Sequence, residues 1–369
     1  MTKFIYRSKT DENLIGNSYL YIEKMIFGSK DNQEKTSIFR DMFSKAVKKV
    51  AIYPWGTDTD DLSSTATGIC KYDDNDAIEI EMWGYTNAPT DKYKWIEHQG
   101  VHEFCHAFVD ILSLTNSDKI VKKGIVRENH AGLIKETDQK TGEFVDHHYY
   151  GKMFNETMMD IISAMAINNF APEITYKTVD DVLSENYTKT GNQQTGYTFF
   201  TSLTRLMIAA FSNVGDKNFK YQDKVDAGES IFNQNYKLRD GSVVKANDFL
   251  YGIVFDPLHI EKEFDKYMDD DSWRTFSQSL DTFFMHYQKT GELLPENVAL
   301  IMEYIPDFCN KRMADYERRG AITIDESNNM ASNFNEIWNS MQREYGAYFS
   351  QERINKISDR ASKYRASKY

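Results

Sequence analysis

The stretch VHEFCHAFVD at residues 101–110 decides most of what can be predicted about this chain. It places His102 and His106 four positions apart, with Glu103 directly after the first histidine. On an α-helix, residues i and i+4 lie on one face, so both imidazoles can reach one metal ion. A pattern this short also arises by chance on an ordinary amphipathic helix, and the rest of the chain has to separate the two interpretations.

The composition is that of a soluble globular protein. The chain has 369 residues, of which 41% are hydrophobic and 27% charged, so it can form one large domain or two ordinary ones. Its net charge of −12 repels nucleic acid, and it has no basic stripe, so we expect no nucleic-acid partner. No apolar run reaches the roughly 18 to 20 residues of a transmembrane helix.

Residues 1–16 and the cysteines bear on the compartment. The stretch MTKFIYRSKTDENLIG lacks an apolar core and a small-residue cleavage site, which predicts a cytoplasmic protein. A secreted chain whose signal segment had been removed would look the same. Cys70, Cys105 and Cys309 are far apart and form no CxxC pair, so we expect reduced thiols and neither a thiolate zinc site nor a disulfide framework. The oligomeric state is not indicated.

The elements around the motif predict an α+β fold with a small mixed sheet. Residues 33–48 have the apolar spacing of a helix, and a second helix follows Pro89 and runs through the motif to about Leu114. Between these helices the sequence predicts strands at 50–55, 65–72 and 77–84. In the last of them, AIEIEMWG, apolar and acidic residues alternate, which is typical of a strand with one buried and one wet face at or near a sheet edge.

The remainder of the chain is predicted to be mainly helical. Residues 119–146 are polar and turn-rich and favour one or two short surface hairpins, whereas helical periodicity dominates from Lys152 onward. We find no linker long enough to separate independent domains. We therefore expect an N-terminal α/β lobe over 1–115 and a mainly helical C-terminal lobe over 116–369, which together form one catalytic unit.

A catalytic zinc ion needs a third protein ligand and one open position for water. The extended motif HExxHxxGxxH would supply that ligand, but Val109 and Leu112 stand where it requires glycine and histidine. A glutamate later in the chain is the other source, and the candidates are Glu128, Glu136, Glu143 and Glu156. The first three lie in the polar hairpin region, where glutamates are expected simply because the surface is exposed to solvent.

Glu156 lies in a strongly amphipathic helix, GKMFNETMMDIISAMAINNF at 151–170. Glu156 and Asp160 are four positions apart and share a face in an apolar setting, where paired carboxylates are costly unless a metal or hydrogen bonds compensate. A zinc ion bound by Glu156, with Asp160 accepting a hydrogen bond from a ligand histidine, would compensate both. The alternative is that the two acids mark the wet side of a surface helix.

The segments VHEFCHAF and FNETMMD together resemble the gluzincin branch of the zinc metallopeptidases, distantly thermolysin-like, whose pattern is HExxH followed by NExxxD on a second helix. The resemblance covers about residues 35–170 and implies a zincin-like fold. It implies that His102, His106 and Glu156 bind Zn²⁺, that Glu103 is the general base and that Asp160 is the hydrogen-bond partner of His102. Its substrate-pairing edge strand would be residues 77–84, with Ile80 and Met82 as substrate-binding residues.

Two departures limit the resemblance to the site and the fold. His106 and Glu156 are 50 residues apart, more than in the best-known members of that branch, and Met159 replaces the usual serine. The run DHHYYGK offers donors for the oxyanion of the reaction, of which we select His147 and Tyr150. His148, Tyr149 and Tyr197 are further options, and for each of the five taken alone an ordinary structural role is the favoured explanation.

The sequence therefore predicts a zinc-dependent peptidase that acts on a peptide or protein substrate. An endopeptidase is favoured, because no GxMEN-type motif for a free amine is present. The alternative is a catalytically inactive interaction protein that keeps a zincin scaffold with structural zinc. Glu103 favours the enzyme, since an inactive scaffold would be free to lose its general base.

Overall fold

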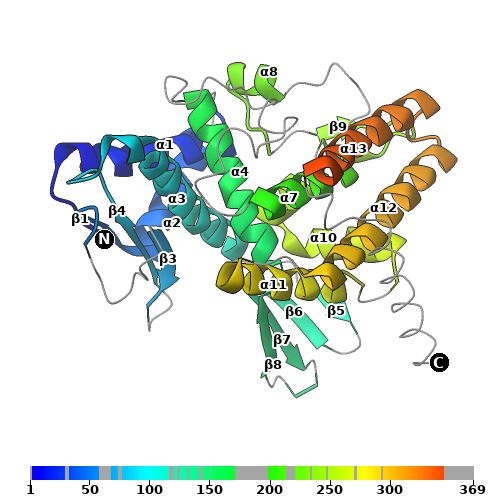
Figure 1. Ribbon diagram of the computed structural model, residues 1–369, viewed down its shortest axis with the longest axis horizontal. Helices are drawn as coiled ribbons and strands as arrows, with labels where there is room; N and C mark the ends of the chain where they lie inside the picture. Colours follow the sequence, from blue (N-terminus) through cyan, green and yellow to red (C-terminus); the bar gives the residue numbers. More distant parts are fainter. Residues whose placement is uncertain are drawn as a thin grey trace. The chain divides into compact units, whose positions relative to one another are not determined.

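A computed structural model of the chain is shown in Figure 1. It describes residues 2–29, 33–57, 68–73, 77–115, 120–122, 125–130, 133–138, 140–141, 144–149, 151–170, 198–212, 221–232, 235–246, 248–269, 272–291 and 294–344. The protein is of mixed α and β structure, as the sequence predicts. None of the described helices is long and apolar enough to cross a membrane.

The chain divides into two compact units. The first comprises Met1–Ser117, Glu156–Gly196 and Lys220–Gln234, and the second comprises Asp118–Asn155, Tyr197–Phe219 and Asn235–Tyr369. The boundary expected at residue 115 assigns Glu156 to the second lobe, whereas here it groups with the first. The reason is that Glu156 and Asp160 contact the histidines of the first unit.

The first unit contains a four-stranded mixed sheet in the order β1-β2-β4-β3. Strands β1 (Lys3–Ile5), β2 (Val47–Tyr53) and β4 (Ile78–Trp83) are parallel, and β3 (Gly68–Tyr72) runs antiparallel to β4. Helix α3 (Tyr93–Thr115), which carries the HExxH motif, lies against β3 and β4 (Figure 1). The small mixed sheet and the helix that carries the HExxH motif agree with the prediction, whereas strand β1 was not predicted.

Strand β4 differs from the expectation in two ways. It is hydrogen-bonded to β2 on one side and to β3 on the other, so it lies near the sheet edge but is not the edge strand that the family resemblance implies; that strand is β3. Its acidic face is also not wet: Glu81 is buried, because Lys49 and Lys71 form ion pairs with its carboxylate. The two lysines come from neighbouring strands, a pairing that the β4 sequence alone does not contain.

Helix α1 (Lys9–Phe27) anchors the loop that leads into α3. The Ser8 side chain accepts a hydrogen bond from the Asp11 backbone N–H, which caps the helix start. The buried Asp11 carboxylate in turn accepts hydrogen bonds from the Tyr85 backbone N–H and the Thr86 hydroxyl, both in the loop after β4. Helix α1 is not among the elements expected from the sequence, although its start is well capped.

The other helices that the structure describes in the first unit are α2 (Gln33–Ala46), η1 (Thr90–Lys92), α8 (Tyr221–Asp226) and most of α4 (Lys152–Phe170). Helix α2 packs Phe39 and Phe43 against Phe108 on the apolar side of α3. The three rings are buried, so this cluster holds the motif helix from the face opposite its polar residues.

The second unit is mostly helical, as predicted for the C-terminal lobe. Its described residues form the helices α7 (Thr198–Ala210), α9 (Asp248–Phe255), α10 (Pro257–Tyr267), α11 (Ser272–Thr290), α12 (Pro295–Arg318) and α13 (Ile324–Glu344). The predicted hairpin region forms a four-stranded antiparallel sheet of β5 (Ile120–Lys122), β6 (Ile125–His130), β7 (Leu133–Asp138) and β8 (Phe144–Tyr149). Strands β9 (Asn235–Lys237) and β10 (Val243–Lys245) form a hairpin.

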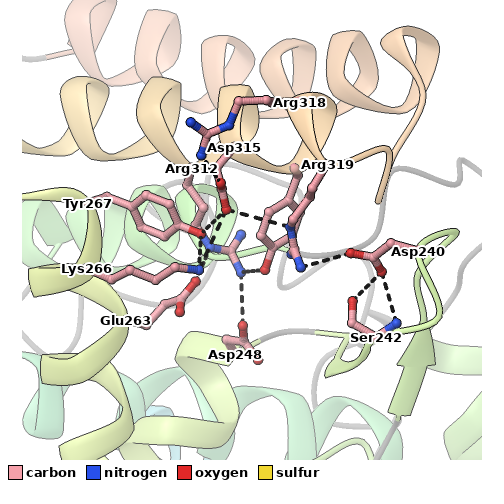
Figure 2. A network of polar contacts seen from close by, with 11 residues as sticks. Asp240, Ser242, Asp248, Glu263, Lys266, Tyr267, Arg312, Asp315, Arg318 and Arg319 are labelled. Atoms are coloured by element: carbon pink, nitrogen blue, oxygen red, sulfur yellow. Dashed lines mark hydrogen bonds and ion pairs between the residues drawn. The ribbon is translucent and has the colours of Figure 1, made fainter.

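A buried cation organises the helices of the second unit (Figure 2). Arg312 of α12 is fully buried and pairs with Asp248 at 2.9 Å and Glu263 at 3.0 Å. It also donates to the Ser212 carbonyl and the Tyr316 hydroxyl. A buried guanidinium requires such partners, because an unpaired charge is very costly in the interior.

The start of α4 is capped by a side chain of α11. The Asp281 carboxylate accepts hydrogen bonds from the backbone N–H of Gly151 at 3.0 Å and of Met153 at 2.8 Å. The first N–H groups of a helix lack partners within it, so Asp281 satisfies donors that would otherwise stay unpaired. The helix fixed in this way carries Glu156 one turn further on.

Candidate metal centre

Helix α3 presents three histidines on one side. His98, His102 and His106 follow each other at intervals of four residues, whereas Val101, Phe104 and Phe108 are buried on its apolar side. Because successive turns of a helix superpose residues four apart, the three imidazoles form a row. The two histidines of the motif are the end of that row nearest to Glu156.

The structure brings together the three ligands that the sequence predicts. His102 Nε2 and His106 Nε2 are 3.0 Å apart, and Glu156 Oε2 lies 3.6 Å from the first and 3.7 Å from the second. His102 is buried, and the other two are partly exposed. This places two imidazole nitrogens and one carboxylate oxygen around a single point.

The spacing of these donors fits a zinc ion. Zinc binds histidine nitrogen and carboxylate oxygen at about 2.0 to 2.2 Å with tetrahedral angles, which places any two ligand atoms roughly 3.4 Å apart. The three separations of 3.0, 3.6 and 3.7 Å bracket that value. The donor set, two imidazoles and one carboxylate, is also one that zinc enzymes use.

Asp160 sets the tautomer of His102. Its Oδ1 atom lies 2.9 Å from His102 Nδ1, and both side chains are buried. A carboxylate accepts only, so the proton of the neutral imidazole belongs on Nδ1, and Nε2 keeps the lone pair that a metal requires. The predicted partnership between Asp160 and His102 is thus present in the geometry.

The site is electrostatically suited to a cation. Burial acts to raise the pKa of Glu156, but the neighbouring His106 and His102 outweigh it and hold that pKa far below its usual range. For Asp160, burial is likewise outweighed, by hydrogen bonds from His102 and His98, and its pKa falls to about 2. Both carboxylates are therefore ionised at neutral pH. A divalent cation would displace protons from the two imidazoles.

Glu103 is positioned for proton transfer. It is 4% exposed, and Gln99, one turn earlier, donates a hydrogen bond to its Oε1 atom. Burial raises the pKa of Glu103 above its ordinary value, and the adjacent His102 and His106 oppose that shift. A raised pKa brings a carboxylate closer to the range in which a general base works best.

Strand β3 lies across α3 at both ends of the motif. A Cβ atom at Gly68 would come within 2.6 Å of Glu103 Cγ, so only glycine allows this approach. Four residues along the strand, the Tyr72 hydroxyl donates to the buried Asp110 carboxylate at 2.9 Å. Burial raises the pKa of Asp110 to about 7, with His106 and the Tyr72 hydrogen bond acting to lower it.

Two of the other predicted site residues, Ile80 and Met82, lie in the core. They are 0% and 1% exposed in a strand that is paired on both sides, so they do not lie on a free edge with which a substrate could pair. His147 lies in β8, but its side chain is outside the described part of the chain, as are Tyr150 and Tyr197. The rejected ligand candidates Glu128 and Glu136 lie in β6 and β7, and Glu143 is outside the described residues.

Three residues that contact the candidate site were not predicted from the sequence. His98, one turn before the motif, lies 3.1 Å from Asp160 Oδ1 through its Nε2 atom. Its spacing from His102 was the available signal. Gln99 and Gly68 left no such signal, because their contacts with Glu103 depend on the side-chain conformation and on the course of a separate strand.

The chain was compared with protein-family models, with curated proteins and with solved structures. None of the three comparisons found a match. The function therefore has to be argued from the residues of the site.

Proposed function

We propose that this chain is a zinc-dependent peptidase with a zincin-like first unit, and that it hydrolyses internal peptide bonds of a peptide or protein. One observation carries the proposal: His102, His106 and Glu156, from two helices far apart in sequence, offer three ligand atoms within 4.8 Å of one another. Asp160 and Glu103 stand beside them in the positions that the gluzincin pattern implies. Among the described residues this group has three donors, which would leave a fourth position for water or substrate.

Each residue of the site has a defined task in this reaction. A zinc ion held by His102, His106 and Glu156 would supply Lewis acidity toward a substrate carbonyl and a water molecule. Glu103 accepts the proton of that water on its carboxylate and delivers it to the leaving amine nitrogen. Gln99 holds Glu103 Oε1, and Asp160 holds the His102 ring. The donor to the oxyanion stays a prediction, with His147 and Tyr150 as its candidates.

The edge strand β3 is the place where we expect the substrate backbone to pair. One side of β3 is hydrogen-bonded to β4, and no described strand pairs with the other. An extended peptide can add to such an edge through main-chain hydrogen bonds. Since Gly68 touches Glu103, a peptide along β3 would pass close to the general base. This role was predicted for residues 77–84 and moves here to 68–72.

The experiment compares the wild type with Glu103→Gln and with Glu34→Gln, a matched change at an exposed glutamate of α2. We expect one zinc per chain in all three proteins. We expect hydrolysis of a mixed peptide library by the wild type and by Glu34→Gln, and a loss of about 10²- to 10⁴-fold for Glu103→Gln.

Two outcomes would overturn the proposal. Absence of zinc from the wild type would show that the site is not a zinc site. Equal hydrolysis by the wild type and Glu103→Gln would remove the general base from the mechanism. Bound zinc without hydrolysis of any peptide would instead favour the alternative, an inactive scaffold that keeps zinc for structure.

A further inference from the structure

Asp160 accepts hydrogen bonds from two histidines through a single oxygen. Its Oδ1 atom lies 2.9 Å from His102 Nδ1 and 3.1 Å from His98 Nε2. The side chains of Asp160, His102 and His98 are 2%, 6% and 13% exposed. His98 is therefore part of a buried polar chain that runs from one turn before the motif to the metal ligands.

The second hydrogen bond has a clear physical effect on the aspartate. The other oxygen, Oδ2, is buried and has no hydrogen-bond partner among the described residues. With His102 as its only donor, the carboxylate could rotate about its Cβ–Cγ bond, because either oxygen can accept. A second donor on Oδ1 removes that freedom, and it stabilises the ionised carboxylate in a buried position.

A metal-binding role for His98 is the main competing explanation. His98, His102 and Asp160 also offer three donor atoms within 4.8 Å. A metal in that group would use His102 Nδ1, whereas the first site uses His102 Nε2. Both sites could be filled together only if His102 lost both ring protons, and the short contact between His102 Nδ1 and Asp160 then could not be a hydrogen bond. The observed distances favour hydrogen bonding.

We infer that His98 is a positioning residue of the metal centre, which orients Asp160 and through it the His102 ring. The inference rests on the proposed zinc site but not on peptidase activity. Groups that hydrogen-bond to metal ligands from outside usually contribute about 10- to 100-fold to metal affinity. His98 acts one step further out, so its removal is expected to weaken zinc binding by about 10-fold, at the lower end of that range.

The test measures the zinc dissociation constant by competition with a chelator. His98→Phe removes the N–H donor. His98→Asn has a shorter side chain whose N–H group cannot reach Asp160, whereas His98→Gln keeps an N–H group at a similar distance from the backbone. We expect about 10-fold weaker zinc binding for the first two variants and a near wild-type value for His98→Gln. His286→Phe, the same change at a partly buried histidine of the second unit, serves as the control and should leave zinc affinity unchanged.

A double-mutant cycle with Asp160→Ala, which removes the acceptor, separates positioning from general damage. If His98 acts through Asp160, His98→Phe will weaken zinc binding no further in the Asp160→Ala background. Additive losses in the cycle, or unchanged affinity in both His98→Phe and His98→Asn, would overturn the inference. Two zinc ions per wild-type chain, reduced to one by His98→Phe, would show that His98 is a ligand. A wild type that binds zinc but hydrolyses nothing would contradict the proposed peptidase and leave this inference standing.

Discussion

Replacing Gly68 with alanine tests the placement of Glu103, the proposed general base, without changing a proposed metal ligand. An alanine Cβ at this position would lie 2.6 Å from Glu103 Cγ, 2.7 Å from Oε1 and 3.0 Å from Cδ. Ordinary van der Waals contact begins near 3.4 Å, so the closest pair falls short by about 0.8 Å.

The side chain of Glu103 has to move to relieve this steric overlap. The three closest atoms all belong to it, and none of them is backbone, so strand β3 can keep its position while the carboxylate moves. Movement of the carboxylate strains the hydrogen bond from Gln99. A misplacement of about 1 Å can cost an enzyme roughly 10²-fold in rate. We therefore expect Gly68→Ala to lose about two orders of magnitude in kcat/KM and to bind zinc like the wild type.

The assay is peptide hydrolysis together with zinc content and thermal unfolding. Gly16→Ala in α1 is the matched control, because a Cβ there would meet nothing within 4 Å. It should keep full activity and gain about 0.5 to 1 kcal/mol of stability, since alanine is the better helix former. Wild-type kcat/KM in Gly68→Ala would refute the reasoning. Loss of zinc from Gly68→Ala would show that the strand moved and not the glutamate.

Two further predictions concern stability. Arg312→Met should destabilise the protein by about 3 to 5 kcal/mol in urea unfolding, because Asp248 and Glu263 lose their buried cation. Lys311→Met, at an exposed neighbour, should cost under about 1 kcal/mol, and equal losses would contradict this account. Burial raises the pKa of Asp281 to about 6, against hydrogen bonds from backbone N–H groups, so the folded state binds a proton more tightly than the unfolded state. The Asp281 carboxyl therefore adds to the free energy of unfolding below pH about 4, and this contribution is lost as the pH rises through about 6. Asp281→Asn should flatten the dependence of the unfolding free energy on pH in this range. An unchanged slope of unfolding free energy against pH would contradict the prediction.

The parts of the site that are local in sequence could be predicted from it. His102, Glu103 and His106 lie on one helix, and Glu156 and Asp160 on another, so helical periodicity alone fixes which of them share a face. The high cost of burying Glu156 and Asp160 unpaired then indicates that the two helices meet at a cation.

The parts that depend on strand order could not be predicted. The alternation in β4 correctly separates an apolar face from an acidic face, but it does not indicate which strands lie beside β4. Lys49 and Lys71 neutralise Glu81 from those neighbours, which turns an apparently wet face into a buried one. For the same reason, the edge strand expected at β4 is in fact β3. The sequence also concealed the contact between Gly68 and Glu103, since that contact joins two elements about 35 residues apart.

The number of donors at the metal centre bears on the choice between an enzyme and an inactive scaffold. Structural zinc sites are closed by four protein ligands, whereas catalytic sites have three and keep one position open. Within the described part of the chain, the group around His106 offers three donors. The buried carboxylate nearest in sequence to these ligands, Glu103, is held by Gln99 and has a raised pKa instead of the lowered pKa of Glu156. Two glutamates with opposite shifts at one site fit a base and a ligand, a division of roles that structural zinc does not require.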